Sequence, residues 1–128
     1  MQKNIVLDKE QVETSSLTDF IIECIQDSKG LNIVKLDLRD LEEAPADFFV
    51  VCEGTSSTQV SGIAQNVEKK VKDELNIKSS HSEGKLFSNW VLLDYFNVIV
   101  HVFYHETRKF YEIEDLWSDA KITEYENI

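Results

Sequence analysis

The run Phe48-Phe49-Val50-Val51-Cys52 is apolar at every position, and it limits the possible folds more than any other part of the sequence. A strand with one face in solvent alternates apolar and polar residues, whereas a strand covered on both faces is apolar throughout. The run therefore predicts a central strand of a sheet with other elements packed on both sides. Just before it, apolar and charged residues alternate over positions 34–39, which predicts a neighbouring strand with one wet face.

Two stretches have apolar residues at helical spacing. In the first they occupy positions 17, 20, 21, 24 and 25, with Ser16 expected to cap the start and Gly30 to follow the end. In the second, an apolar face extends from Val60 to Leu75. Ser56 and Gln59 match a capping box at its start, in which each side chain bonds the other residue's backbone N–H.

The second half of the chain predicts a hairpin and a last helix. Residues 90–93 and 98–103 read as two strands joined by a short connection, which makes them antiparallel. A short strand is expected near residues 77–81 and a helix over residues 106–118. Together these elements predict an α/β fold: a single domain with a mixed sheet of about five strands flanked by helices.

We place the domain at residues 16–118, between an N-terminal extension (1–15) and an acidic C-terminal tail (119–128) that is expected to fray. No apolar run approaches the ~20 residues of a membrane span. The N-terminus also has neither signal-peptide nor transit-peptide character. We therefore expect a cytoplasmic protein without membrane contact, in which Cys24 and Cys52 are buried free thiols.

The charge balance limits the possible partners. The 128 residues include 13 Lys and Arg against 24 Asp and Glu, a net charge of −11. Proteins that grip nucleic acid neutralise its phosphates with Lys and Arg, so we expect little direct contact with RNA or DNA. A basic protein partner would suit this surface, but the acidity could equally serve solubility alone.

The Gly54-Thr55-Ser56-Ser57 turn lies where nucleotide-binding folds hold phosphate, at the start of a helix. A nucleotidyltransferase also needs two carboxylates that alternate on one strand, and here only Asp94 ends the strand in that position. The turn lacks the lysine of a P-loop. The three histidines have no Cys-x-x-Cys pair beside them to complete the three or four ligands that zinc requires. We expect no enzyme activity, no cofactor and no metal, with His101 a hydrogen-bonded sheet residue.

Aromatic residues and an arginine are concentrated in the predicted hairpin and last helix. The residues are Trp90, Asp94, Tyr95, Arg108, Tyr111 and Trp117. Aromatic side chains and arginine anchor many protein interfaces. Trp117 is expected in the core, whereas Trp90 fits a core or an interface position equally well.

Several of these motifs together resemble the ribosomal silencing factor family, also called Iojap-related. They are DFFVV at 47–51, GTSS at 54–57, Glu83-Gly84 before WVLLDY at 90–95, and VIVHVF at 98–103 before Arg108, Tyr111 and Leu116-Trp117. The GTSS turn is a weak signal alone. The linked set is specific, and it spans about residues 16–118.

The resemblance implies a nucleotidyltransferase-like topology without the catalytic carboxylates. It also implies a translation repressor that binds the large ribosomal subunit at its ribosomal protein number fourteen and blocks joining of the small subunit under nutrient limitation. A large-subunit assembly factor and a residual nucleotide-binding enzyme stay open as alternatives, and a homodimer through the same sheet edge is possible. The partner-binding residues that the resemblance implies are Glu83, Trp90, Leu93, Asp94, Tyr95, His101, Arg108 and Tyr111.

One departure from the family pattern concerns the hairpin turn. The family usually has Gly-Asp where this chain has Phe96-Asn97. Asn tolerates a positive φ, whereas Phe does so poorly, which leaves the turn type and the shape of the docking edge open. An exposed Phe96 could add a contact of its own.

Overall fold

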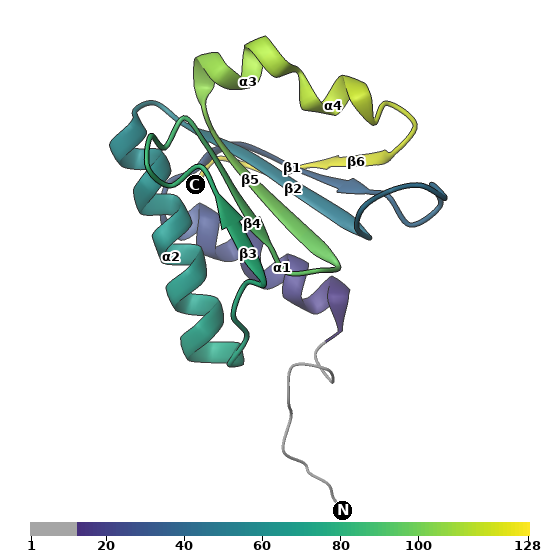
Figure 1. Ribbon diagram of the computed structural model, residues 1–128, viewed down its shortest axis with the longest axis horizontal. Coiled ribbons are helices and arrows are strands. Elements are labelled where there is room, and N and C mark those ends of the chain that lie inside the picture. The colour runs from purple at the N-terminus through teal and green to yellow at the C-terminus, as the bar shows by residue number, and fades with distance from the viewer. Residues whose placement is uncertain (1–12) are drawn as a thin grey trace, which may run out of the picture.

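A computed structural model describes residues 13–128 (Figure 1). Within that range the chain forms one six-stranded mixed sheet in the order β3-β4-β5-β2-β1-β6. The strands are β1 (Leu31–Asp37), β2 (Phe48–Gly54), β3 (His81–Glu83), β4 (Trp90–Asp94), β5 (Val98–Tyr104) and β6 (Lys121–Glu124). The helices are α1 (Thr14–Asp27), α2 (Ser57–Leu75), α3 (His105–Tyr111) and α4 (Ile113–Leu116). The predicted α/β fold with a mixed sheet is confirmed, while most of the predicted N-terminal extension lies outside the described residues.

The centre of the sheet is β2, which pairs in parallel with β5 and antiparallel with β1. Residues 48–52 are all buried, as the apolar run predicts. Phe48, Val50 and Cys52 point into a core with α1 and α2, whereas Phe49 and Val51 belong to a second core on the opposite face. The two-sided burial of β2 therefore divides the interior into two cores.

The two faces of the sheet are covered to different extents. Helices α1 and α2 lie on one face, and α3 and α4 lie on the other (Figure 1). On the α3–α4 face the fully buried residues come mainly from β1, β2 and β5, while Trp90 and Leu92 of β4 are only partly buried. Within residues 13–128, the β3–β4 end of this face is therefore left without a covering helix.

The helix starts differ in part from the predictions. Helix α1 begins at Thr14 after Glu13, which makes no side-chain cap, so the expected cap at Ser16 is wrong. Helix α2 begins after Ser56, whose Oγ accepts from the Gln59 N–H (3.1 Å) as predicted. The other half of the capping box does not form, because the Gln59 side chain turns to Thr55.

The last helix and the tail also differ from the predictions. The helix is broken at Glu112, whose φ of 47° separates α3 from α4. The expectation of a frayed tail is wrong, since β6 pairs antiparallel with β1 and becomes the sixth strand. The strand expected near residues 77–81 is β3, displaced to His81–Glu83, and Ile77 instead packs into the core.

The hairpin turn has Phe96 at a φ of 70°. The Asn97 N–H donates to the Tyr95 carbonyl (2.9 Å), an i to i+2 bond that makes this a γ-turn. The Asp94 carboxylate accepts from the Phe96 N–H (2.7 Å) and so supports the uncommon backbone conformation. Phe96 is 73% exposed, so this turn presents an aromatic side chain to solvent.

None of the helices in residues 13–128 is long and apolar enough to cross a membrane.

The loop between β3 and β4 depends on Gly84. Its φ is 83°, and a Cβ added there would lie 1.9 Å from the Trp90 carbonyl oxygen. We expect Gly84→Ala to lower the free energy of unfolding by about 2–3 kcal/mol in chemical denaturation, because both the backbone and its neighbour would have to shift. Gly62, inside α2 with open space around it, is the matched control. Gly62→Ala should raise stability by about 0.5–1 kcal/mol, since Ala favours the helix.

Candidate functional site

The open end of the α3–α4 face brings together five of the eight predicted partner-binding residues. Glu83, Leu92 and His101 lie opposite one another across β3, β4 and β5. Trp90 and Asp94 lie two residues on either side of Leu92 and therefore share its face of the strand. Tyr111 of α3 packs against Trp90, with ring centroids 4.8 Å apart. We call the surface formed by Glu83, Trp90, Leu92, Asp94, His101 and Tyr111 the open face.

Trp90 is the centre of the open face and is held from three sides. Its ring stacks on Phe103 at 4.7 Å and contacts Tyr111, while its Nε1–H donates to Nδ1 of His101 (3.2 Å). Trp90 is only partly buried and Tyr111 is 49% exposed. Trp90 is thus both a core and a surface residue. Trp117 packs against Phe49, 5.8 Å away, at the edge of the second core.

His101 supports the open face from beneath. It is 3% exposed, and because Nδ1 accepts from Trp90, the ring proton of the neutral form lies on Nε2. Among the described residues Nε2 has no hydrogen-bond partner. Burial lowers the pKa of His101 to about 4, so the ring is neutral at pH 7. The prediction of a hydrogen-bonded sheet residue is confirmed, and His101 offers a partner no charge.

Leu93 and Tyr95 lie on the other face of β4, in the core under α1 and α2. Leu93 is fully buried, and the Tyr95 hydroxyl is buried with a raised pKa caused mainly by desolvation. Neither side chain reaches the open face. Leu92 does, and strand alternation with Trp90 and Asp94 is the sequence signal that places it on their face of the sheet.

Arg108 is a buried support rather than an exposed contact. Its guanidinium donates to the Asn32 carbonyl (2.7 Å), to Glu53 (3.0 Å) and to Glu114 (2.8 Å). These bonds connect α3 and α4 to β1 and β2. Because Tyr111 lies on the same short helix, Arg108 helps to fix the position of Tyr111 over Trp90.

The side chain of Gln59 folds back onto the Gly54–Ser57 turn and takes up hydrogen-bond donors there. Oε1 of Gln59 accepts from both the N–H and the hydroxyl of Thr55 (2.7 and 3.0 Å). Ser56 Oγ accepts from the Gln59 N–H, so the Thr55 and Gln59 N–H groups of this turn already have partners within the protein. The described residues contain no group of three or more His, Cys, Asp or Glu that could hold a metal ion. Cys24 and Cys52 are buried free thiols, as predicted.

The burial of His101 predicts a pH-dependent stability. The unfolded ring has a pKa near 6.5 and the folded ring one of about 4. Between these values the unfolded chain takes up a proton that the native chain does not. The free energy of unfolding should therefore fall by roughly 3 kcal/mol as pH drops from 6.5 to 4. Denaturation of His101→Gln across this range should lose most of that slope, whereas the exposed His81→Gln should keep it; equal slopes in both would contradict the assignment.

Comparisons with known proteins agree on one family. A family model described as "ribosomal silencing factor during starvation" matches residues 11–128. A ribosomal silencing factor from Halalkalibacterium halodurans is 35% identical over 117 residues, covering 91% of this chain and 98% of the relative. Another from Bacillus subtilis is 36% identical over 98 residues, covering 77% and 81%. A mouse protein named "mitochondrial assembly of ribosomal large subunit protein 1" is 32% identical over 75 residues, which is 32% of its length.

Solved structures give the same result for the fold. A crystal structure of a Chromobacterium violaceum protein superposes with a TM-score of 0.79 at 34% identity, covering 84% of this chain and 88% of the other. A Bacillus halodurans structure has a TM-score of 0.74 at 33% identity, with 88% and 100% covered. Since the family model covers nearly the whole chain and full-length relatives exceed 30% identity, this protein belongs to the ribosomal silencing factor family.

Proposed function

We propose that the chain represses translation by binding the large ribosomal subunit at its ribosomal protein number fourteen, so that the small subunit cannot join. In this proposal the open face makes the contact and the repression operates in the cytoplasm under nutrient limitation. The observation on which the proposal rests is that the helices leave a strip of aromatic and apolar side chains uncovered on an otherwise acidic protein.

The composition of the open face suits a protein partner. Trp90, Leu92 and Tyr111 form an aromatic and apolar centre, and Glu83 and Asp94 lie around it. Interfaces commonly combine aromatic anchors with a polar rim. The net charge of −11 would speed the encounter with a basic ribosomal protein.

The rigidity of the open face also favours binding. Phe103, His101 and Tyr111 hold the Trp90 ring, and the strand backbone fixes Leu92 and Asp94. A surface that is already ordered loses little side-chain entropy when a partner covers it. Repression by occupation of a surface makes and breaks no covalent bond, so the proposed mechanism requires no cofactor.

A second candidate is a factor for large-subunit assembly, and the name of the mouse relative favours it.

Two further alternatives are a residual nucleotide-binding enzyme and a homodimer formed through the sheet edge that carries the open face. The homodimer would cover the open face and compete with docking. The nucleotide-binding enzyme would have to displace Gln59 from the Gly54–Ser57 turn.

Subunit joining in vitro separates these candidates. Purified large subunits are incubated with the protein, small subunits are added, and the mixture is run on a density gradient. Fewer joined ribosomes, with the protein in the large-subunit peak, support the proposal. Co-sedimentation with normal joining favours the assembly role. If the protein does not co-sediment, even at concentrations where it is monomeric, the proposal is wrong.

Tyr111 is the sharpest test of the open face, since it is half-exposed and contacts Trp90 from the surface. Tyr111→Ala should weaken binding to the large subunit by about 30-fold, the loss expected at an interface hot spot. Phe87→Ala is the matched control, because Phe87 is exposed and lies against α2 on the other side of the sheet. Equilibrium sedimentation with labelled protein measures both. Similar affinities for the two variants would show that Tyr111 is not a contact.

A further inference from the structure

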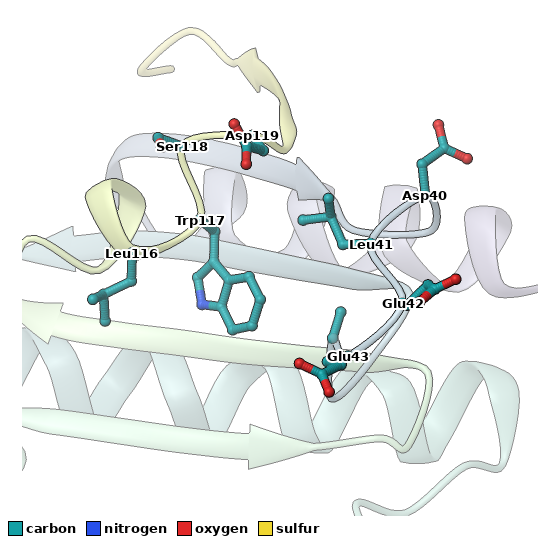
Figure 2. Close-up of a pocket in the computed structure, with 9 residues that line it drawn as sticks. Asp40, Leu41, Glu42, Glu43, Leu116, Trp117, Ser118 and Asp119 are labelled. Carbon is teal, nitrogen blue, oxygen red and sulfur yellow. The ribbon is translucent and has the colours of Figure 1, made fainter.

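A groove of about 440 Å³ lies on the α3–α4 side of the sheet, away from the open face. One wall is the loop between β1 and β2, and the other is the segment that joins α4 to β6; Figure 2 shows the two walls facing each other. The lining residues are Asp40, Leu41, Glu42, Glu43, Ala44, Leu116, Trp117, Ser118 and Asp119.

Part of the groove is apolar, and no other residue of the described range 13–128 covers it. Leu41, Ala44 and Trp117 are half-buried and pack against the second core. The Trp117 indole points toward the sheet in Figure 2, and Leu116 beside it is 76% exposed. An exposed leucine next to a half-buried tryptophan offers contact area to an apolar side chain from outside.

The polar part of the groove has a single sign of charge. Asp40, Glu42, Glu43 and Asp119 are exposed, and none of the lining residues is a cation. In the described part of the chain none of these four carboxylates takes part in an ion pair, whereas Asp73 and Glu114 each do. Arg39 lies next to Asp40, but its guanidinium bonds both oxygens of Asp37. Four like charges around an apolar floor complement a cationic chain with an apolar side chain.

Other occupants fit less well. Residues 13–128 contain no group of three or more His, Cys, Asp or Glu that could hold a metal ion, so the four carboxylates are not arranged around one ion. A nucleic acid would bring further negative charge to four carboxylates. A basic peptide segment is the occupant that both the charge and the apolar floor favour.

The groove and the open face lie on the same side of the sheet. A series of rings joins them, with Trp117 5.8 Å from Phe49, Phe49 4.6 Å from His101, and His101 6.0 Å from Trp90. Because Trp90 and Trp117 pack against the same core on one side of the sheet, a partner docked on Trp90 could extend a segment toward Trp117 without passing around the edge of the molecule.

We propose that this groove binds a Lys/Arg-rich segment of the partner that docks on the open face, with its cations on the four carboxylates and one apolar side chain against Leu116 and Trp117. The identity of the partner rests on the proposed function, whereas the chemistry of the groove does not. The groove would act as a second contact that strengthens docking and fixes its orientation.

The first test uses free protein and a synthetic peptide of Lys and Arg around one Leu. In a Trp90→Phe variant, Trp117 is the remaining tryptophan and its fluorescence reports on the groove. We expect the signal to saturate at low salt and the binding to weaken as salt rises. A peptide with Glu in place of every cation should not bind. No change in Trp117 fluorescence with the basic peptide would overturn the proposal.

A neutralised variant identifies the carboxylates. Asp40→Asn, Glu42→Gln, Glu43→Gln and Asp119→Asn combined should weaken peptide binding by about tenfold or more. The control neutralises four exposed acids of α1 and α2, namely Asp19, Glu23, Asp27 and Glu74, which changes the net charge equally. Equal weakening in both variants would show that the effect comes from the net charge of the protein alone, and the proposal that the groove binds the peptide would be wrong.

The second test measures binding of the same two variants to large subunits. Weaker binding by the groove variant alone supports a partner shared with the open face, and unchanged binding overturns it. If the unaltered protein does not bind large subunits at all, the proposed function fails, and the peptide experiment still decides whether the groove binds a basic segment.

Discussion

The parallel pairing of β2 with β5 is the constraint on which the rest of the structure depends. Both strands are buried along nearly their whole length, so the sheet must be covered on both faces. Two long helices cover one face. After β5 the chain supplies only the short helices α3 and α4 to the other, and this cover ends before β4 and β3. The open face thus follows from an unequal distribution of helices around a central pair of strands.

The same arrangement explains why the exposed aromatic residues are well ordered. Trp90 rests on Phe103 and bonds His101, and both residues belong to β5, an interior strand that is paired on both edges. Arg108 joins the short helices to β1 and β2 through three separate hydrogen bonds, so Tyr111 approaches Trp90 from a fixed direction. A surface built this way is already ordered and would lose little side-chain entropy if a partner covered it.

Much of the fold could be predicted from the sequence, because apolar periodicity determines β1, β2, both long helices and the hairpin. The break at Glu112 could not, since a left-handed glutamate leaves no local signal. Strand β6 could not either, because its four residues are exposed and it is held by backbone pairing to β1.

Within the site, Trp90, Asp94 and Tyr111 were identified correctly as neighbours. The resemblance implies Leu93 and Tyr95 as well, but strand alternation places both on the opposite face of β4 from Trp90 and Asp94. The burial of Arg108 depends on partners 55 and 76 residues away.

Strand β4 has a genetic consequence of its own. Leu92 and Leu93 are adjacent and chemically identical, yet one contributes to a surface and the other to the helix-covered core. Substitutions along this strand should alternate between loss of activity in a soluble, abundant protein and loss of the protein itself. A mutational scan that scores protein abundance and growth separately would therefore show the two kinds of defect alternating with a period of two residues along β4, without any structure of the complex.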